Sequence, residues 1–252
     1  MKHIAVLFMT IFCCAAAFTD TIYVSPDGTL DAPYDSWATA ANDIQTAVDA
    51  ASAGDTVFVT NGIYNAGGAV TPGYSLNNRV CITRAISVES VNGPEVTIVD
   101  GAGAMRGVYL SAGTLSGFTV THGATWESGG SWQHDRSGGG VWLGDGTTAS
   151  NCVISKSSAA TGGGVFLFNG GVLSTCRIVD NISLNEGGGV FVTHDGAQID
   201  RCEIRGNGCF ADGSDGGGIW LKATGASVQN CLITGNEAED AGGGACFSIW
   251  RP

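Results

Sequence analysis

Charged residues are scarce in this chain. Only 13% of its 252 residues are charged, while 44% are hydrophobic. A chain of this length and composition can bury a sizeable core, which excludes intrinsic disorder. Glycine is abundant, with 40 residues, but it falls well short of the one position in three that collagen requires. The glycines therefore mark turns.

Basic side chains are about half as numerous as acidic ones, at 11 against 23, which gives a formal net charge of −12. This balance disfavours nucleic acid and anionic membranes as partners. The sequence also lacks a run of acidic residues. Its dispersed carboxylates are explained by the solubility of a secreted protein better than by cation storage.

The apolar run Ile4–Phe12 is too short to span a bilayer as a helix. It follows a basic start and precedes the small residues Ala15–Ala17. We therefore expect a signal peptide over residues 1–17, cleaved before Phe18. The mature protein would be secreted, or held at the cell surface of a bacterium, with no membrane-spanning segment.

Three glycines followed by an apolar residue recur in the second half of the sequence, in steps of 24, 25, 29 and 26 residues. A Cys-x-Ile phrase follows each of the first four copies, and an asparagine or serine lies five residues beyond each cysteine. The glycine copies begin at Gly138, Gly162, Gly187, Gly216 and Gly242, the cysteines are Cys152, Cys176, Cys202 and Cys231, and the polar residues are Ser157, Asn181, Asn207 and Asn236. Such a constant phase predicts a solenoid with coils of about 25 residues.

Each coil contains apolar-x-apolar triplets and no helical stretch of ten residues, which predicts two short strands per coil. Stacked coils place identical residues in ladders, so the asparagines can exchange amide hydrogen bonds. Side chains on stacked strands lie about 4.8 Å apart, beyond the ~3.5–4.5 Å between Cβ atoms that a disulfide needs. We therefore expect the four ladder cysteines to be buried, unbridged thiols.

The lack of leucine throughout each unit excludes leucine-rich repeats, and the lack of nine-residue glycine-aspartate repeats excludes calcium β-rolls. The repeats resemble the pectate-lyase-like superfamily, and the Cys-x-Ile-x-x-Asn phrase is also similar to the repeats of polymorphic outer-membrane proteins. The resemblance implies an all-β fold, a right-handed parallel β-helix. In that superfamily, pectate lyases combine a calcium-binding carboxylate cluster with an arginine base, and related hydrolases use paired aspartates. Neither pattern maps onto residues of this chain.

Residues 18–54 are expected to form an N-terminal strand and a capping helix. The phrase Tyr23–Gly28 followed by Trp37–Ala40 resembles the opening of many bacterial secreted β-helix proteins. Asn42 is expected to cap the helix, with Gln45 three residues later. Residues 55–252 then form the β-helix, which we expect to be truncated at its C-terminal end because no polar cap follows the last repeat.

A long turn between Gly123 and Gly138 is the clearest candidate for a functional insertion. Its aromatic and ionisable side chains could stack a sugar and transfer protons, or they could simply fold the loop onto the sheet. The candidate acid–base residues are Glu127, His134, Asp135 and Arg136, and the candidate sugar-stacking residues are Trp126 and Trp132.

A column of aromatic residues occupies the same strand position in five copies: Tyr109, Trp142, Phe166, Phe191 and Trp220. If the neighbouring aliphatic residues point inward, alternation sends these rings outward. We expect an exposed apolar stripe that binds sugar rings, with self-stacking of the rings or cover by a neighbouring chain as the alternative.

No metal site is predicted, since the cysteines lack a Cys-x-x-Cys spacing or a nearby histidine. Calcium is left open at Asp212 and Asp215, although the motif is short and a solvated turn explains these residues better. Every clear signal is architectural, so the favoured function is a non-catalytic module that binds glycans or another cell-surface partner. The alternative is a lyase or hydrolase that acts on an extracellular polysaccharide.

Overall fold

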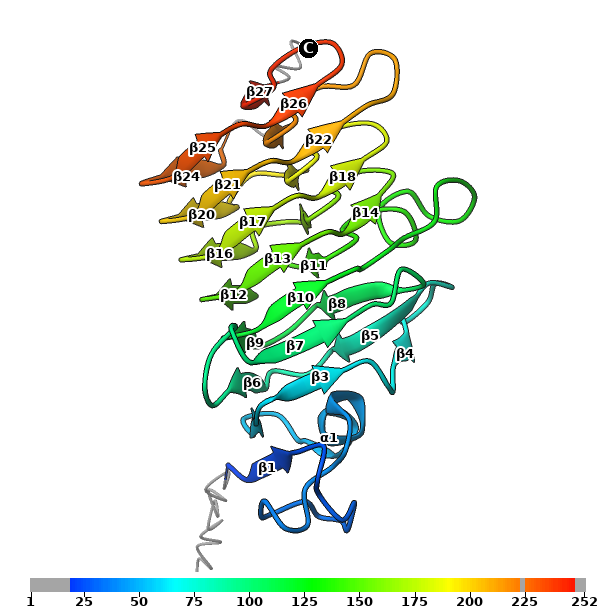
Figure 1. The fold of residues 1–252 in the computed structure, drawn as a ribbon, viewed down its shortest axis with the longest axis vertical. Helices are drawn as coiled ribbons and strands as arrows, with labels where there is room; N and C mark the ends of the chain where they lie inside the picture. The colour runs from blue at the N-terminus through cyan, green and yellow to red at the C-terminus, as the bar shows by residue number, and fades with distance from the viewer. Residues whose placement is uncertain (1–18, 223–224, 248–252) are drawn as a thin grey trace, which may run out of the picture.

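The computed structural model describes residues 19–222 and 225–247, so the predicted signal peptide lies outside it. The described chain winds into a parallel β-helix whose coils stack along the long axis of the molecule (Figure 1). Its strands form four sheets, named A to D here. Among the described residues, every pairing inside the sheets is parallel except that of β4 with β5. No helix in this part of the chain is long and apolar enough to cross a membrane.

Sheets A and B run the whole length of the solenoid. Sheet A contains β1 (Thr21–Val24), β2 (Thr56–Val59), β6 (Ser87–Ser90), β9 (Thr114–Ser116), β12 (Thr148–Ser150), β16 (Val172–Ser174), β20 (Gln198–Asp200) and β24 (Ser227–Gln229). Sheet B contains β3 (Gly62–Tyr64), β7 (Thr97–Asp100), β10 (Thr119–Thr121), β13 (Val153–Ser155), β17 (Arg177–Val179), β21 (Glu203–Arg205) and β25 (Leu232–Thr234).

Sheet C carries the aromatic column, and sheet D is confined to the later coils. Sheet C contains β4 (Ala69–Val70), β5 (Asn77–Ile82), β8 (Arg106–Leu110), β11 (Val141–Leu143), β15 (Val165–Leu167), β19 (Val190–Val192), β23 (Ile219–Leu221) and β27 (Ala245–Phe247). Sheet D contains β14 (Ser158–Ala159), β18 (Ile182–Ser183), β22 (Gly208–Cys209) and β26 (Glu237–Ala238).

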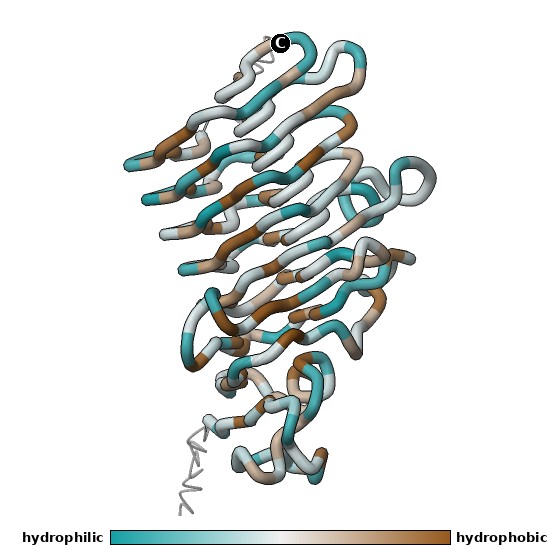
Figure 2. The backbone as a smooth tube through the Cα atoms, viewed as in Figure 1, coloured by the Kyte–Doolittle hydropathy of each residue, from teal (hydrophilic) through white to brown (hydrophobic). Residues whose placement is uncertain are grey.

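The later coils thus contain four strands each, and the prediction of two is wrong. The missed strands are too short to show a pattern: β12 has a single inward side chain, Ala149, and β14 has two residues. The inward residues of sheets A, B and C form one continuous core, as Ile154, Ile178 and Ile204 show by stacking in register without solvent exposure. Figure 2 shows hydrophobic residues recurring along successive coils.

The glycine triplet makes the turn between sheets D and C, and each of its glycines is required for a different reason. Gly162 has a φ of +63°, which side-chain-bearing residues rarely adopt. A Cβ atom on Gly163 would lie 2.1 Å from the carbonyl oxygen of Ile182. A Cβ atom on Gly164 would lie 2.9 Å from Nδ2 of Asn181. The triplet therefore allows adjacent coils to approach each other at the asparagine ladder.

The asparagine ladder connects each coil to the next. The backbone N–H groups of Ser157, Asn181 and Asn207 each donate to the side-chain oxygen of the asparagine one coil later, at 3.0, 3.0 and 2.9 Å. The Nδ2 groups of Asn181 and Asn207 also donate onward to Oδ1 of the following asparagine. Asn181 and Asn207 are almost fully buried, so these amides satisfy polar groups that water cannot reach.

The cysteine ladder lines the core beside sheet B. Cys152, Cys176, Cys202 and Cys231 are free thiols, and the first three are buried. Cys231 is only partly buried, contrary to expectation. It holds the last position of the ladder in the described range, so no cysteine of a further coil stacks on it there.

Helix α1 (Ile44–Ala50) packs at the N-terminal end of the solenoid (Figure 1). Its N-cap is Asp43, whose carboxylate accepts the N–H of Thr46 at 2.9 Å, and not Asn42 as expected. Asn42 instead donates to the carbonyl of Gly28 in the preceding loop. Gln45 is buried and accepts the N–H of Cys81 at 2.7 Å, so it ties the helix to β5. Tertiary hydrogen bonds therefore override the local capping pattern.

Candidate functional site

The aromatic column on sheet C does point away from the solenoid core, but it is not exposed to solvent. Its five rings are between 0% and 9% exposed and form a second hydrophobic cluster outside the coils. The rings stack closely, with centroid distances of 4.5 Å for Tyr109–Trp142 and 4.7 Å for Phe191–Trp220. The expected exposed stripe is therefore wrong for Tyr109, Trp142, Phe166, Phe191 and Trp220.

The insertion between Gly123 and Gly138 supplies much of the cover. Trp132 packs edge-on against Phe166 and Phe191, with ring centroids 6.0 and 6.4 Å away. His134 lies 5.1 Å from the Trp142 ring, and the Trp142 indole N–H donates to the carbonyl of Gln133 at 2.9 Å. The insertion is thus folded back onto the sheet. The sequence left this folded-back loop open as one of two alternatives, but it did not predict that the loop covers the aromatic column.

A buried arginine that sequence reasoning missed anchors the insertion. Arg106 in β8 is fully buried and donates to the carbonyls of Gly138, Ser137 and His134. It also donates to the side chain of Asn78 at 2.8 Å. Burial lowers the pKa of Arg106 to about 9, so its guanidinium remains a cation at neutral pH. Hydrogen bonds to a buried charge are stronger than those between neutral groups.

Asp135, a candidate general acid or base, serves a structural purpose in this arrangement. Its carboxylate accepts the backbone N–H groups of Ser75, Leu76 and Ser131 at 3.0, 2.9 and 2.8 Å. Burial would raise the pKa of Asp135, but these three donors and the charge of Arg106 outweigh burial and lower the pKa. The carboxylate is therefore ionised, and its oxygens are already engaged by backbone N–H groups.

His134 is sandwiched in the same region. Its ring stacks on Tyr74 with a centroid distance of 3.9 Å and an interplanar angle of 11°. Burial lowers the pKa of His134, the nearby Arg106 charge lowers it further, and Asp135 opposes both effects. A neutral imidazole packed between rings is better suited to covering the aromatic column than to transferring a proton to a substrate.

The other candidates at the insertion do not join Asp135 in one site. Glu127 lines a separate hollow of about 60 Å³ with Thr125 and Leu184, beside sheet D. Arg136 anchors the following turn, where its carbonyl accepts the N–H of Ala160 at 3.0 Å. Trp126 is largely exposed and its backbone N–H donates to the carbonyl of Asp135.

The candidate calcium ligands lie in the turn after β22. Asp215 accepts the backbone N–H of Ala241 at 3.0 Å through Oδ1, which links this turn to the next coil. Asp212 is exposed. Within residues 19–222 and 225–247, no three side chains of His, Cys, Asp or Glu come together as a metal site would require.

An open aromatic groove lies near the N-terminal end, on the outer face of sheet A. Tyr23 and Phe58 are in register on β1 and β2, and Glu89 follows on β6. Trp37 packs edge-on against Tyr23 with ring centroids 4.5 Å apart, and it remains 44% exposed. With Ser90 and Val91, these residues line a groove of about 410 Å³.

Sequence reasoning missed this groove. The phrases containing Tyr23 and Trp37 indicate only the start of the fold, and Phe58 belongs to a coil without the glycine and cysteine landmarks. The useful signal was the alternation in β1 and β2, which sends Tyr23 and Phe58 to the outer face.

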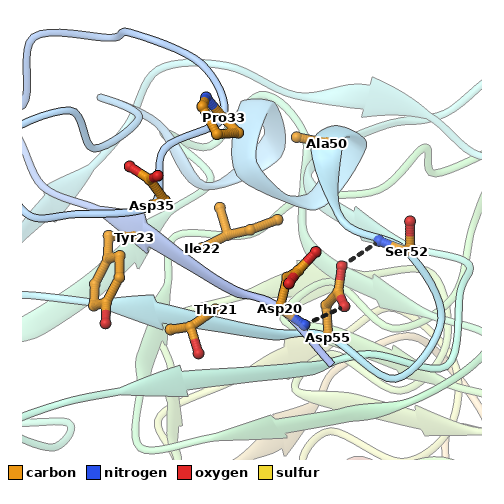
Figure 3. A pocket seen from close by; sticks show the side chains of 9 residues that line it. All are labelled: Asp20, Thr21, Ile22, Tyr23, Pro33, Asp35, Ala50, Ser52 and Asp55. Atoms are coloured by element: carbon orange, nitrogen blue, oxygen red, sulfur yellow. Dashed lines mark hydrogen bonds between the residues drawn. The ribbon is translucent and has the colours of Figure 1, made fainter. Parts of the chain in front are cut away.

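A second hollow, of about 460 Å³, lies beside the groove and includes Tyr23 in its lining. Figure 3 shows Asp20 and Asp55 at one end and Asp35 at the other. Asp55 accepts the N–H groups of Asp20 and Ser52, at 2.8 and 2.7 Å, so its carboxylate closes the turn before β2. These contacts give Asp55 a structural role, and the carboxylates make this end of the molecule acidic.

Comparison with known proteins agrees with this architecture. A family model described as a right-handed β-helix region matches residues 139–245. No curated protein matches the chain. One similar solved structure is pectin methylesterase PemA from Erwinia chrysanthemi, with a TM-score of 0.54 and 12% identity, over 89% of this chain and 68% of that one. At this identity the likeness concerns the fold alone. The chain is thus a right-handed parallel β-helix with the pectate-lyase-like fold.

Proposed function

We propose that this chain is a secreted or cell-surface module of a bacterium that binds glycans without acting on them, and that the groove around Trp37 is the binding site. The single observation that supports this proposal is the cluster of accessible rings, Trp37, Tyr23 and Phe58, beside the carboxylate of Glu89. The secreted location is supported by the sequence of residues 1–17 alone.

The groove has the chemistry that sugar recognition requires. Aromatic rings with one accessible face stack on the apolar faces of pyranoses. A carboxylate accepts hydrogen bonds from sugar hydroxyls, which fixes the orientation of the stacked ring. The groove volume of about 410 Å³ falls within the range of small-molecule sites.

The contacts at the insertion favour binding over catalysis. Glycoside hydrolysis needs two carboxylates that flank one bond. Asp135 is buried and holds three backbone N–H groups, whereas Glu127 lines a different hollow. The fold likeness to a pectin methylesterase keeps a polysaccharide-acting enzyme as the alternative outcome of the test.

Calorimetry with the mature chain and a panel of neutral and acidic oligosaccharides tests the proposal. We expect Trp37→Ala to lower the affinity for the bound sugar by about 5- to 150-fold, since one lost stacking contact is worth about 1–3 kcal/mol. The matched control is Phe210→Ala, which removes another exposed aromatic ring far along the solenoid.

Loss of binding in Trp126→Ala, with Trp37→Ala unaffected, would place the site at the insertion and contradict the proposal. The same sugars are then incubated with the chain, with and without calcium. Release of methanol, new reducing ends or unsaturated products would overturn the non-catalytic assignment.

A further inference from the structure

The outer face of sheet A continues beyond the aromatic groove as a row of hydroxyl groups. The outward positions form two columns along the solenoid, because paired strands place equivalent residues side by side. One column is Thr21, Thr56, Ser87, Thr114, Thr148 and, on β16, the apolar Val172, and the other is Tyr23, Phe58, Glu89, Ser116, Ser150 and Ser174. All of these side chains remain partly exposed, in contrast to the covered column on sheet C.

Four of the eight serine and threonine hydroxyls in these columns are held in order as two hydrogen-bonded pairs. Thr114 donates to the Ser87 hydroxyl at 3.1 Å, and Ser150 donates to the Ser116 hydroxyl at 3.2 Å. A hydroxyl has one donor and two acceptor lone pairs, so each retains capacity for a ligand. Ordered groups on a rigid sheet lose little conformational entropy when they bind.

The charges along this face select against an acidic ligand. The outward residues of β1, β2, β6, β9, β12 and β16 include Glu89 and no lysine or arginine. Further along sheet A, Arg201 follows β20 and is paired with the neighbouring Asp200 at 3.0 Å. Carboxylate-bearing sugars need basic partners, as charge complementarity between protein and ligand requires. A neutral chain therefore fits this face, and a uronate chain does not.

The length of the face matches an extended chain of several rings. Four coil steps separate Phe58 from Ser174, which at about 4.8 Å per step is roughly 19 Å. The spacing of the coils is close to the advance of an extended pyranose chain per ring. Successive rings can thus meet equivalent hydroxyls on successive coils.

We infer that the ligand is an extended neutral polysaccharide, which stacks one end on Tyr23, Trp37 and Phe58 and runs along the hydroxyl columns of sheet A toward Ser174. This inference rests on the proposed glycan-binding function and deepens it. The groove provides the apolar contact, and the hydroxyl columns provide the dependence on chain length.

The test measures affinity against chain length with gluco-, xylo- and manno-oligosaccharides of two to six rings. We expect the affinity of the preferred series to rise at least ~10-fold from two rings to six. In Ser150→Glu the gain should disappear while the disaccharide affinity stays unchanged, because a charge now stands in the path of the longer chain. The matched control is Val153→Glu, which adds the same charge to the same coil on the outer face of β13. Thr148→Glu repeats the test in the other column.

The outcomes separate the two claims. If affinity is already maximal at two rings, or if Ser150→Glu and Thr148→Glu behave like Val153→Glu while Trp37→Ala abolishes binding, the groove binds sugar but the extended path is wrong. If polygalacturonate fragments bind more tightly than every neutral series, the assignment of a neutral ligand is wrong. If no oligosaccharide binds, both the function and the path are wrong. Thermal unfolding of each variant verifies that the fold is retained.

Discussion

Removing one asparagine from the ladder tests how the coils are held together. Asn207 is 1% exposed, and Asn207→Ala deletes both functional groups of its side chain. Its Oδ1 accepts from the N–H and the Nδ2 of Asn181, each at 3.0 Å. Its Nδ2 has two N–H groups, which donate to the carbonyl of Ile178 and to Oδ1 of Asn236, both at 2.9 Å, and one of them is shared with the carbonyl of Arg205 at 3.1 Å.

Four hydrogen bonds at about 1 kcal/mol each predict a loss of about 4 kcal/mol in the free energy of unfolding. Two donors of the buried Asn181 also lose their acceptor, and these unsatisfied groups destabilise the folded state further. With a slope of about 3 kcal/mol per molar urea, the midpoint of unfolding should fall by more than about 1 M.

Urea unfolding followed by circular dichroism measures this shift, with Asn92→Ala as the control. Asn92 is exposed, and its side chain donates only to the exposed Asn61 at 2.7 Å. We expect the free energy of unfolding of Asn92→Ala to differ from that of the unchanged protein by about 0.5 kcal/mol or less, so its midpoint should change little. Equal shifts for the two variants would refute the view that the buried amides hold the coils together.

Three further expectations concern the insertion and the thiols. Asp135→Asn should lower the free energy of unfolding by about 1–3 kcal/mol in urea titrations, since backbone N–H groups lose an ionised acceptor; no change would show that these bonds are dispensable. The pKa of His134 is lowered while the insertion is closed on the sheet. In an open insertion the pKa of His134 returns to the ordinary value of 6.5. Below that pH the open form therefore binds more protons than the closed form, and closure weakens as the pH falls. Acrylamide should therefore quench more tryptophan fluorescence at pH 5 than at pH 7, and His134→Phe should remove the difference. Thiol titration in denaturant without reductant should find Cys152, Cys176 and Cys202 reduced, and a disulfide among them would contradict the stacked geometry.

The repeat architecture could be predicted from the sequence because each of the later coils carries the same pattern of residues. The spacing from Cys176 to Asn181 returns as that from Cys202 to Asn207, and a constant phase leaves little choice of register. The cover of Trp142 was not readable, because it depends on where an irregular insertion returns to the sheet. The groove was not readable either, since Tyr23 and Phe58 meet only through pairing of strands 35 residues apart.

The asparagine ladder has a direction, and the direction has a consequence for biosynthesis. In the coils of Ser157, Asn181 and Asn207, a backbone N–H donates to an acceptor that belongs to the coil that follows in the chain. A nascent coil therefore keeps an unsatisfied amide until the next coil has been synthesised and has docked on it. The solenoid should grow vectorially from its N-terminal end, each finished coil acting as the template that selects the register of its successor.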